Sequence, residues 1–317
     1  MKKRLLIIAL SLGLIGNVGC TKVEEIKEKE NYEITLILDA GGVNDQSFNQ
    51  SAWEGALRLK ENHGVEISYM EAKQESDYAT NIENAIDNNS DLVIGVGFKL
   101  TESILEASKN YPSQKFAIVD GDLGEEIPQN VTNIVFNEEE AGYCVGLVAS
   151  QMTNTNKLGF IGGFDIASVT KFKIGFERAI KEENSDIKLV SQYANSFTDS
   201  AKGKAIAQQM ISQGADILFT AGGGVNAGVF EACKESGIKA IGVDMPSNYI
   251  EPTTIITSAL KNVGVGIELV GLDLINNELK GGEAKVFDLS NGGVGFEKTD
   301  LLSDEVIKYV EGKCMNN

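Results

Sequence analysis

Three aspartates each follow an apolar run that is typical of a buried β-strand. Asp39, Asp120 and Asp244 end the runs ITLILD, FAIVD and AIGVD. In open α/β sheets, ligands bind in the crevice beyond the carboxyl ends of the strands. Each carboxylate taken singly could instead cap the helix that follows it. Because all three sit at strand ends, we expect them to converge on one cleft and to accept hydrogen bonds from a ligand.

Aromatic and cationic residues are found near the same strand ends. Phe48 lies in a polar loop that contains glycine, so we expect its ring to stack on a flat ligand group. Phe219, near the end of its strand, is the expected second ring, with Phe197 as the alternative. Lys261 follows an apolar segment that we expect to cross between lobes, which would place a cation beside the acids.

Glycines at these strand ends would let the backbone approach a ligand closely. Gly97 ends one strand, and Gly222 and Gly223 open the run GGGVNA. That run also matches the dinucleotide-binding fingerprint, with Asp244 about 20 residues further on. A dinucleotide-binding oxidoreductase is therefore an alternative. We favour a binding protein, because no catalytic histidine accompanies the run.

The sequence lacks the residues that most enzyme classes need. It has one histidine, His63, and neither a Gly-x-Ser-x-Gly elbow nor a P-loop lysine motif. Cys144, Cys233 and Cys314 are so widely spaced that we expect neither a disulfide nor a zinc site. A formal net charge of -18 argues against a nucleic-acid partner, which needs a basic face. We therefore expect no enzyme activity and no cofactor.

Apolar, β-branched runs alternate with helix-period segments along the body of the chain. The predicted strands cover residues 33–39, 66–70, 91–97, 115–120, 157–162, 188–194, 216–221 and 239–243. The predicted helices cover residues 51–61, 79–88, 100–110, 139–152, 168–182, 201–212 and 225–236. The order repeats after four strands, with a break near 133–137. This repetition predicts an α/β protein with two doubly wound lobes in tandem.

The last third of the chain is expected to join the two lobes. An apolar segment at 254–258, a helix at 263–276 and a strand at 284–288 would return to the first lobe. A tail helix at 303–312 would return to the second. Lobe 1 would then comprise residues 32–135 and about 257–288, and lobe 2 residues 136–256 and about 289–317. Several crossings of this kind predict a hinge over a ligand cleft.

The N-terminus is typical of a secreted lipoprotein. The basic start KKR precedes an apolar run that is too short to span a bilayer, and a small residue precedes Cys20. We expect residues 1–19 to be a signal peptide, Cys20 to carry lipid, and the charged segment 20–31 to be a tether. The body would then be anchored on the extracytoplasmic side of the cell membrane.

The run DAGGVNDQSFNQSAWEG, residues 39–55, resembles the signature of the basic membrane protein family, the PnrA-like nucleoside-binding lipoproteins. Further matching runs are FAIVD at 116–120, GFIGG at 159–163, AGG at 221–223 and GVD at 242–244. The resemblance covers essentially the whole chain. It implies a type I periplasmic-binding-protein fold that feeds an ABC importer, with permease subunits as partners. The implied ligand is a purine nucleoside of the guanosine, inosine or adenosine class.

The resemblance also implies roles for individual residues. Base contacts would be made by Asp39, Phe48, Asn49 and Asp120, with Phe219 as the second ring. Ribose contacts would be made by Asp244 and Lys261, with Gly97, Gly222 and Gly223 lining the pocket. The sequence departs from the family pattern at Gly224 and after Asp244, which leaves the ribose contacts open. A sugar or a signalling molecule in the same fold is the alternative ligand.

Overall fold

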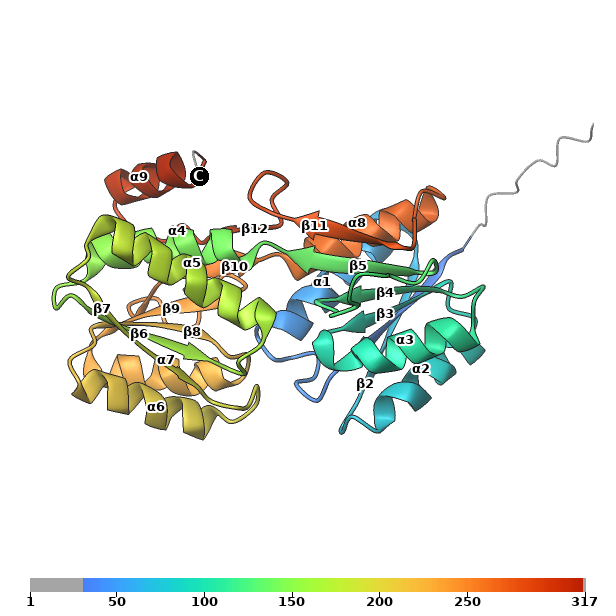
Figure 1. Ribbon diagram of the computed structural model, residues 1–317, viewed down its shortest axis with the longest axis horizontal. Coiled ribbons are helices and arrows are strands. Elements are labelled where there is room, and N and C mark those ends of the chain that lie inside the picture. The colour runs from blue at the N-terminus through green and yellow to red at the C-terminus, as the bar shows by residue number, and fades with distance from the viewer. Residues whose placement is uncertain (1–30, 316–317) are drawn as a thin grey trace, which may run out of the picture. The chain divides into compact units, whose positions relative to one another are not determined.

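The computed structural model describes residues 31–315, and these form one compact unit (Figure 1). The expected signal peptide, the lipid site at Cys20 and almost all of the tether lie outside the described residues. No helix within residues 31–315 is long and apolar enough to cross a membrane.

The first of two sheets has six parallel strands. In spatial order they are β11 (Glu283–Phe287), β5 (Val131–Phe136), β4 (Lys115–Val119), β3 (Leu92–Val96), β1 (Glu33–Leu38) and β2 (Glu66–Glu71). The central strands β3 and β4 are apolar apart from Lys115, the first residue of β4, because helices cover both faces of the sheet. The edge strand β2 is largely exposed and correspondingly polar.

The second sheet repeats this arrangement. In spatial order its strands are β12 (Val294–Phe296), β10 (Ile255–Lys261), β9 (Lys239–Asp244), β8 (Ile217–Ala221), β6 (Lys157–Gly162) and β7 (Lys188–Tyr193). Only β12 runs antiparallel to its neighbour among these described strands. We call the first sheet with its helices lobe 1 and the second sheet with its helices lobe 2.

Helices cover each sheet in pairs (Figure 1). Lobe 1 has α1 (Phe48–His63) with α8 (Val263–Ile275), and α2 (Asp77–Asp87) with α3 (Thr101–Asn110), which follows the short helix η1 (Phe98–Leu100). Lobe 2 has α4 (Glu138–Met152) with α5 (Ala167–Glu183), and α6 (Ser200–Ser212) with α7 (Val225–Ser236). The last helix, α9 (Asp304–Cys314), packs on α4. The expected α/β architecture with two doubly wound lobes is confirmed.

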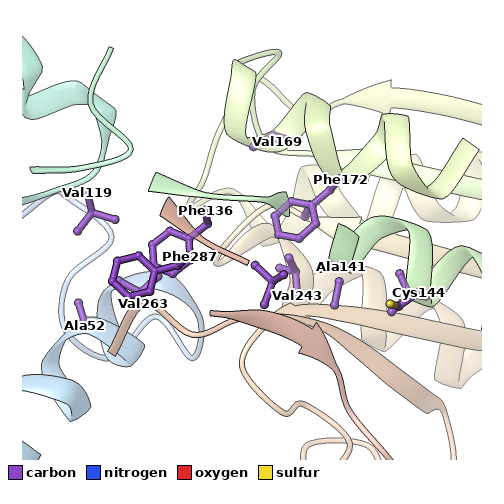
Figure 2. Close-up of a cluster of buried hydrophobic side chains, with 14 of the residues drawn as sticks. Ala52, Val119, Phe136, Ala141, Cys144, Val169, Phe172, Val243, Val263 and Phe287 are labelled. Atoms are coloured by element: carbon purple, nitrogen blue, oxygen red, sulfur yellow. The ribbon is translucent and has the colours of Figure 1, made fainter. Parts of the chain in front are cut away.

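The chain passes between the lobes three times, after β5, after β10 and after β11. The backbone N–H of Asn137 donates to the carbonyl of Phe287 at 2.8 Å, and that of Asn262 donates to Gly293 at 2.8 Å. The rings of Phe136 and Phe287 stack with centroids 5.2 Å apart. Figure 2 shows these two rings within one apolar cluster that continues from lobe 1 into lobe 2.

Two details differ from the sequence-based expectation. The expected break at 133–137 overlaps a strand, β5, whose polar Thr132 and Asn133 disguise it in the sequence. Their side chains bond to the carbonyls of Lys280 and Gly121. The return to lobe 1 begins after Lys261 rather than near 257, because all of β10 pairs within the second sheet.

Cys144 of α4 and Cys314 of α9 form a disulfide with their Cα atoms 6.1 Å apart. The expectation of no disulfide is therefore wrong. The two cysteines are 170 residues apart, so their spacing carries no signal of the pairing. Cys233 is a buried free thiol, and burial raises its pKa to about 12. The disulfide fixes the end of the last helix to lobe 2.

We expect Cys314→Ser to lower the free energy of unfolding by about 2–5 kcal/mol, because a cross-link over a long loop restricts the unfolded chain. Urea denaturation would measure the loss, and peptide mapping without reduction should recover Cys144 linked to Cys314. In reducing buffer, the wild type and the variant should unfold alike. An equal difference in both buffers would contradict a contribution from the disulfide.

Candidate ligand-binding site

A cavity lies between the two lobes at the carboxyl ends of their strands. It holds about 690 Å³ of space not filled by atoms, part of it open to solvent. Eight of the ten predicted contact residues line it: Asp39, Phe48, Asn49, Gly97, Asp120, Gly223, Asp244 and Lys261. The structure thus brings together the three strand-end aspartates. Their roles toward a ligand stay a prediction.

The loop that follows β1 presents acceptor atoms to the cavity. Asp39 Oδ1 accepts from the Gly41 N–H and from Asn49 Nδ2, both at 2.9 Å. This second bond fixes the amide of Asn49, so its Oδ1 is the atom left buried without a partner among the described residues. Asp45 accepts three backbone N–H bonds at the start of α1 and also lines the cavity.

Lys261 lies at the end of β10 and is buried, with a side chain only 2% exposed. Its Nζ donates to Asp120 Oδ2 of lobe 1 at 2.5 Å and to Glu138 Oε1 at 2.7 Å. Burial alone would lower the pKa of Lys261, but the charges and hydrogen bonds of the two carboxylates outweigh it and raise the pKa. Burial raises the pKa of Asp120, and the ammonium of Lys261 opposes that rise. The cation therefore stays charged inside the protein.

Asp244, at the end of β9, contacts lobe 1 directly. The hydroxyl of Ser47, the residue before α1, donates to Asp244 Oδ2. Burial raises the pKa of Asp244 to about 7, although the Ser47 bond and the charge of Lys261 lower it. Near neutral pH, this carboxyl group therefore exists in both protonation states.

Asp120 and Asp244 share an unusual backbone conformation. Their φ angles are 58° and 65°, in the left-handed region that aspartate tolerates better than most residues. They also occupy matching places in the two sheets. Asp120 follows β4, which β3 separates from β1, and Asp244 ends β9, which β8 separates from β6. Each lobe thus turns one carboxylate toward the cavity from a strained strand end.

Aromatic rings line the cavity from both lobes. Phe48 belongs to lobe 1, whereas Phe172 and Phe197 belong to lobe 2. The ring of Phe197 lies against the backbone of Gly163, where an added Cβ would meet its Cε1 at 2.2 Å. Gly163 must therefore be glycine if Phe197 is to hold this position. Phe164 supports the same ring edge-on, with centroids 5.1 Å apart.

Two predicted residues lie outside the cavity wall. Phe219 is fully buried and packs against the rings of Phe160, Phe172 and Phe176. Its side chain points into the core under α5, whereas the alternative, Phe197, lines the cavity. Gly222 lies behind the wall, and its N–H donates to Asn226 Oδ1 at 2.9 Å.

The glycine run that matches the dinucleotide fingerprint is bonded within the protein. Besides the Gly222–Asn226 bond, the N–H of Gly224 donates to the carbonyl of Phe197 at 2.8 Å. These donors are therefore not free to bind a phosphate. Within residues 31–315, no group of His, Cys, Asp and Glu side chains is arranged to hold a metal ion.

The structure adds cavity residues that sequence reasoning did not assign to the site. Val169 and Phe172 of α5 line the cavity, as does Lys99 of η1. The Nζ of Lys99 also lies 5.6 Å from the ring centroid of Phe164, across the cleft. In a sequence, apolar residues on one face of a helix are typical of core packing. Nothing in the sequence therefore indicated that α5 would line the site.

A family model and several relatives match the chain over most of its length. The family model described as "ABC transporter substrate-binding protein PnrA-like" matches residues 33–316. The "ABC transporter nucleoside-binding protein BmpA" of Lactococcus lactis is 34% identical, over 99% of this chain and 98% of the relative. "Basic membrane protein D" of Borreliella burgdorferi is 36% identical, over 78% of this chain and 72% of the relative.

A solved structure shares the architecture. It is that of ABC transporter solute-binding proteins from Aeropyrum pernix, with a TM-score of 0.79 and 28% identity, over 90% of this chain and 80% of that one. The fold is the type I periplasmic-binding-protein fold, as the resemblance implied. The chain belongs to the PnrA-like family of ABC transporter substrate-binding proteins.

Proposed function

We propose that the chain is a lipid-anchored receptor that binds a purine nucleoside between its lobes and delivers it to the permease of an ABC importer. The observation that carries the proposal is the cavity wall, where Phe48 and Phe197 come from opposite lobes and hydrogen-bonding groups lie beside them. Two such rings suit a flat heterocycle. The name of the Lactococcus lactis relative supports a nucleoside, and the lipoprotein pattern at Cys20 supports the anchor.

The polar groups of the cavity suit the two parts of a nucleoside. Asn49 Oδ1 is an acceptor without a partner in the described part of the protein, and a purine N–H can supply the missing donor. Asp244 and Lys261 offer an acceptor and a donor for the ribose hydroxyls. A buried polar group that gains its partner only from the right ligand contributes strongly to specificity.

We propose that the site binds its ligand without converting it. Its carboxylates are engaged with Lys261, Ser47, Asn49 or backbone N–H groups. No cysteine or histidine is among the residues that line the cavity. We expect the ligand to be recovered intact after incubation, and mass spectrometry of the small molecule that co-purifies would identify it.

The first test is a nucleoside panel measured by calorimetry and by thermal shift. Guanosine, inosine or adenosine should bind with micromolar or tighter affinity and raise the melting temperature as the ligand concentration increases. Phe48→Ala should abolish the shift because it removes one stacking ring. Tyr249→Ala, a change of an exposed aromatic residue outside the cavity, is the matched control and should bind normally. A shift with sugars but with no nucleoside would show that the ligand class is wrong.

The second test separates the two candidate rings of lobe 2. Phe197→Ala should weaken nucleoside binding by about tenfold or more, within the range of about 1–3 kcal/mol that one stacked ring contributes, and should change stability little. Phe219→Leu should instead lower stability, since this ring fills the core, while the folded fraction binds with near-normal affinity. Calorimetry at a temperature where both variants are folded would compare them. Weakened binding in the Phe219 variant alone would reverse the assignment.

The third test uses the titration of Asp244. A ribose hydroxyl that donates to this carboxylate favours the ionised form, whereas a pKa of about 7 leaves the ligand-free group mostly protonated at pH 6. The dissociation constant should therefore fall by about tenfold between pH 6 and pH 8, with protons released on binding. Asp244→Asn should remove this pH dependence. Parallel pH profiles for the wild type and the variant would contradict the ribose contact.

A further inference from the structure

Glu138 is a buried carboxylate close to the cavity, and it is not one of the proposed ligand contacts. It is the first residue of α4, two residues after the chain leaves β5 of lobe 1. Its side chain is 1% exposed, whereas the side chain of Glu139, next in the same helix turn, is 39% exposed. Glu138 does not line the cavity. Any effect of Glu138 on the ligand must therefore pass through another residue.

That residue is Lys261, whose Nζ lies 2.7 Å from Glu138 Oε1. Both side chains are almost fully buried, so this is an ion pair without solvent screening. The other carboxylate oxygen, Oε2, has no hydrogen-bond partner within the described part of the chain. It lies 3.6 Å from the Nζ of Lys171, which is half-exposed on α5. Lys261 is thus the main partner of Glu138.

The ammonium of Lys261 has three N–H donors. One bonds to Asp120 and one to Glu138, and among residues 31–315 the third has no recorded acceptor. The rings of Phe48 and Phe136 flank the ammonium, with their centroids 5.3 and 5.1 Å from Nζ. Since Lys261 lines the cavity, the remaining donor is available to a ligand oxygen.

We propose that Glu138 is a positioning residue for the ligand: by holding the Lys261 ammonium from outside the cavity, it directs the third N–H toward the ribose hydroxyls. This role rests on the proposed nucleoside function. Asp120 alone would not fix the ammonium, because Asp120 also lines the cavity and is itself a candidate ligand contact.

The test compares guanosine with 2′,3′-dideoxyguanosine, which lacks the hydroxyls that Lys261 would contact. In the full chain, Glu138→Gln should weaken guanosine binding by about tenfold or more, the effect of one charge-assisted hydrogen bond. Binding of the dideoxynucleoside should change little, so the ratio of the two dissociation constants should shrink. Glu139→Gln, the matched control on the same helix, should leave both constants unchanged.

A double-mutant cycle shows whether Glu138 acts through Lys261. In a Lys261→Met background, Glu138→Gln should cause no further loss of guanosine affinity. Equal weakening of both ligands, an additive loss in the Lys261→Met background, or unchanged guanosine binding would each overturn the positioning role. Circular dichroism and urea unfolding would confirm that the variants are folded at the assay temperature.

If Glu138→Gln does not fold, Glu138→Asp keeps the charge but withdraws it from Lys261. This variant should bind guanosine more weakly than the wild type and should retain less discrimination against the dideoxynucleoside. Wild-type discrimination in that variant would overturn the role. A wild-type protein that binds no nucleoside at all would overturn the proposed function itself, which is a distinguishable outcome.

Discussion

The charge of Lys261 organises the region where the two lobes meet. A buried ammonium is costly unless carboxylates pair with it and hydrogen bonds satisfy it. Here Asp120 comes from lobe 1, Glu138 begins α4 just after the crossing that follows β5, and Lys261 ends β10 just before the next crossing. The ion pairs therefore form only when these two crossings lie side by side. The stacked rings of Phe136 and Phe287 exclude water beside it. The same cation belongs to both the hinge region and the cavity wall, which links the arrangement of the lobes to ligand contact.

Most of the fold could be predicted from the sequence because buried parallel strands have a strong local signature. Strands were predicted for five of the six strands of the first sheet and for four of the six of the second, and helix-period segments marked the helices between them. The strand β5 was missed because Thr132 and Asn133 interrupt its apolar run, and their side-chain bonds reach residues far along the chain. The Cys144–Cys314 disulfide was missed for a related reason, namely that its two cysteines are 170 residues apart. The local sequence around either cysteine does not indicate its partner.

The site was predictable where it depends on strand ends and less so where it depends on which face a side chain occupies. Asp39, Asp120 and Asp244 converge because the carboxyl ends of parallel strands share one edge of each sheet. Successive side chains of a strand point to opposite faces of the sheet. The sequence did not indicate which face Phe219 occupies, and the structure places its ring in the core. Glu138 carries no sequence signal, because it is one of three consecutive glutamates and only the fold buries it.

Neither lobe is a continuous segment of the chain. The edge strand β11 completes the first sheet and β12 completes the second, yet both come from the last 35 residues of the described chain, after almost everything else. During synthesis, therefore, neither sheet can close until residues beyond Glu283 are available, although most of its strands exist long before. The unfinished edges of β5 and β10 would stay unpaired in the meantime and could pair with other chains. The same short stretch of chain therefore completes both lobes, and a chain that ends before Glu283 would lack an edge strand in each sheet.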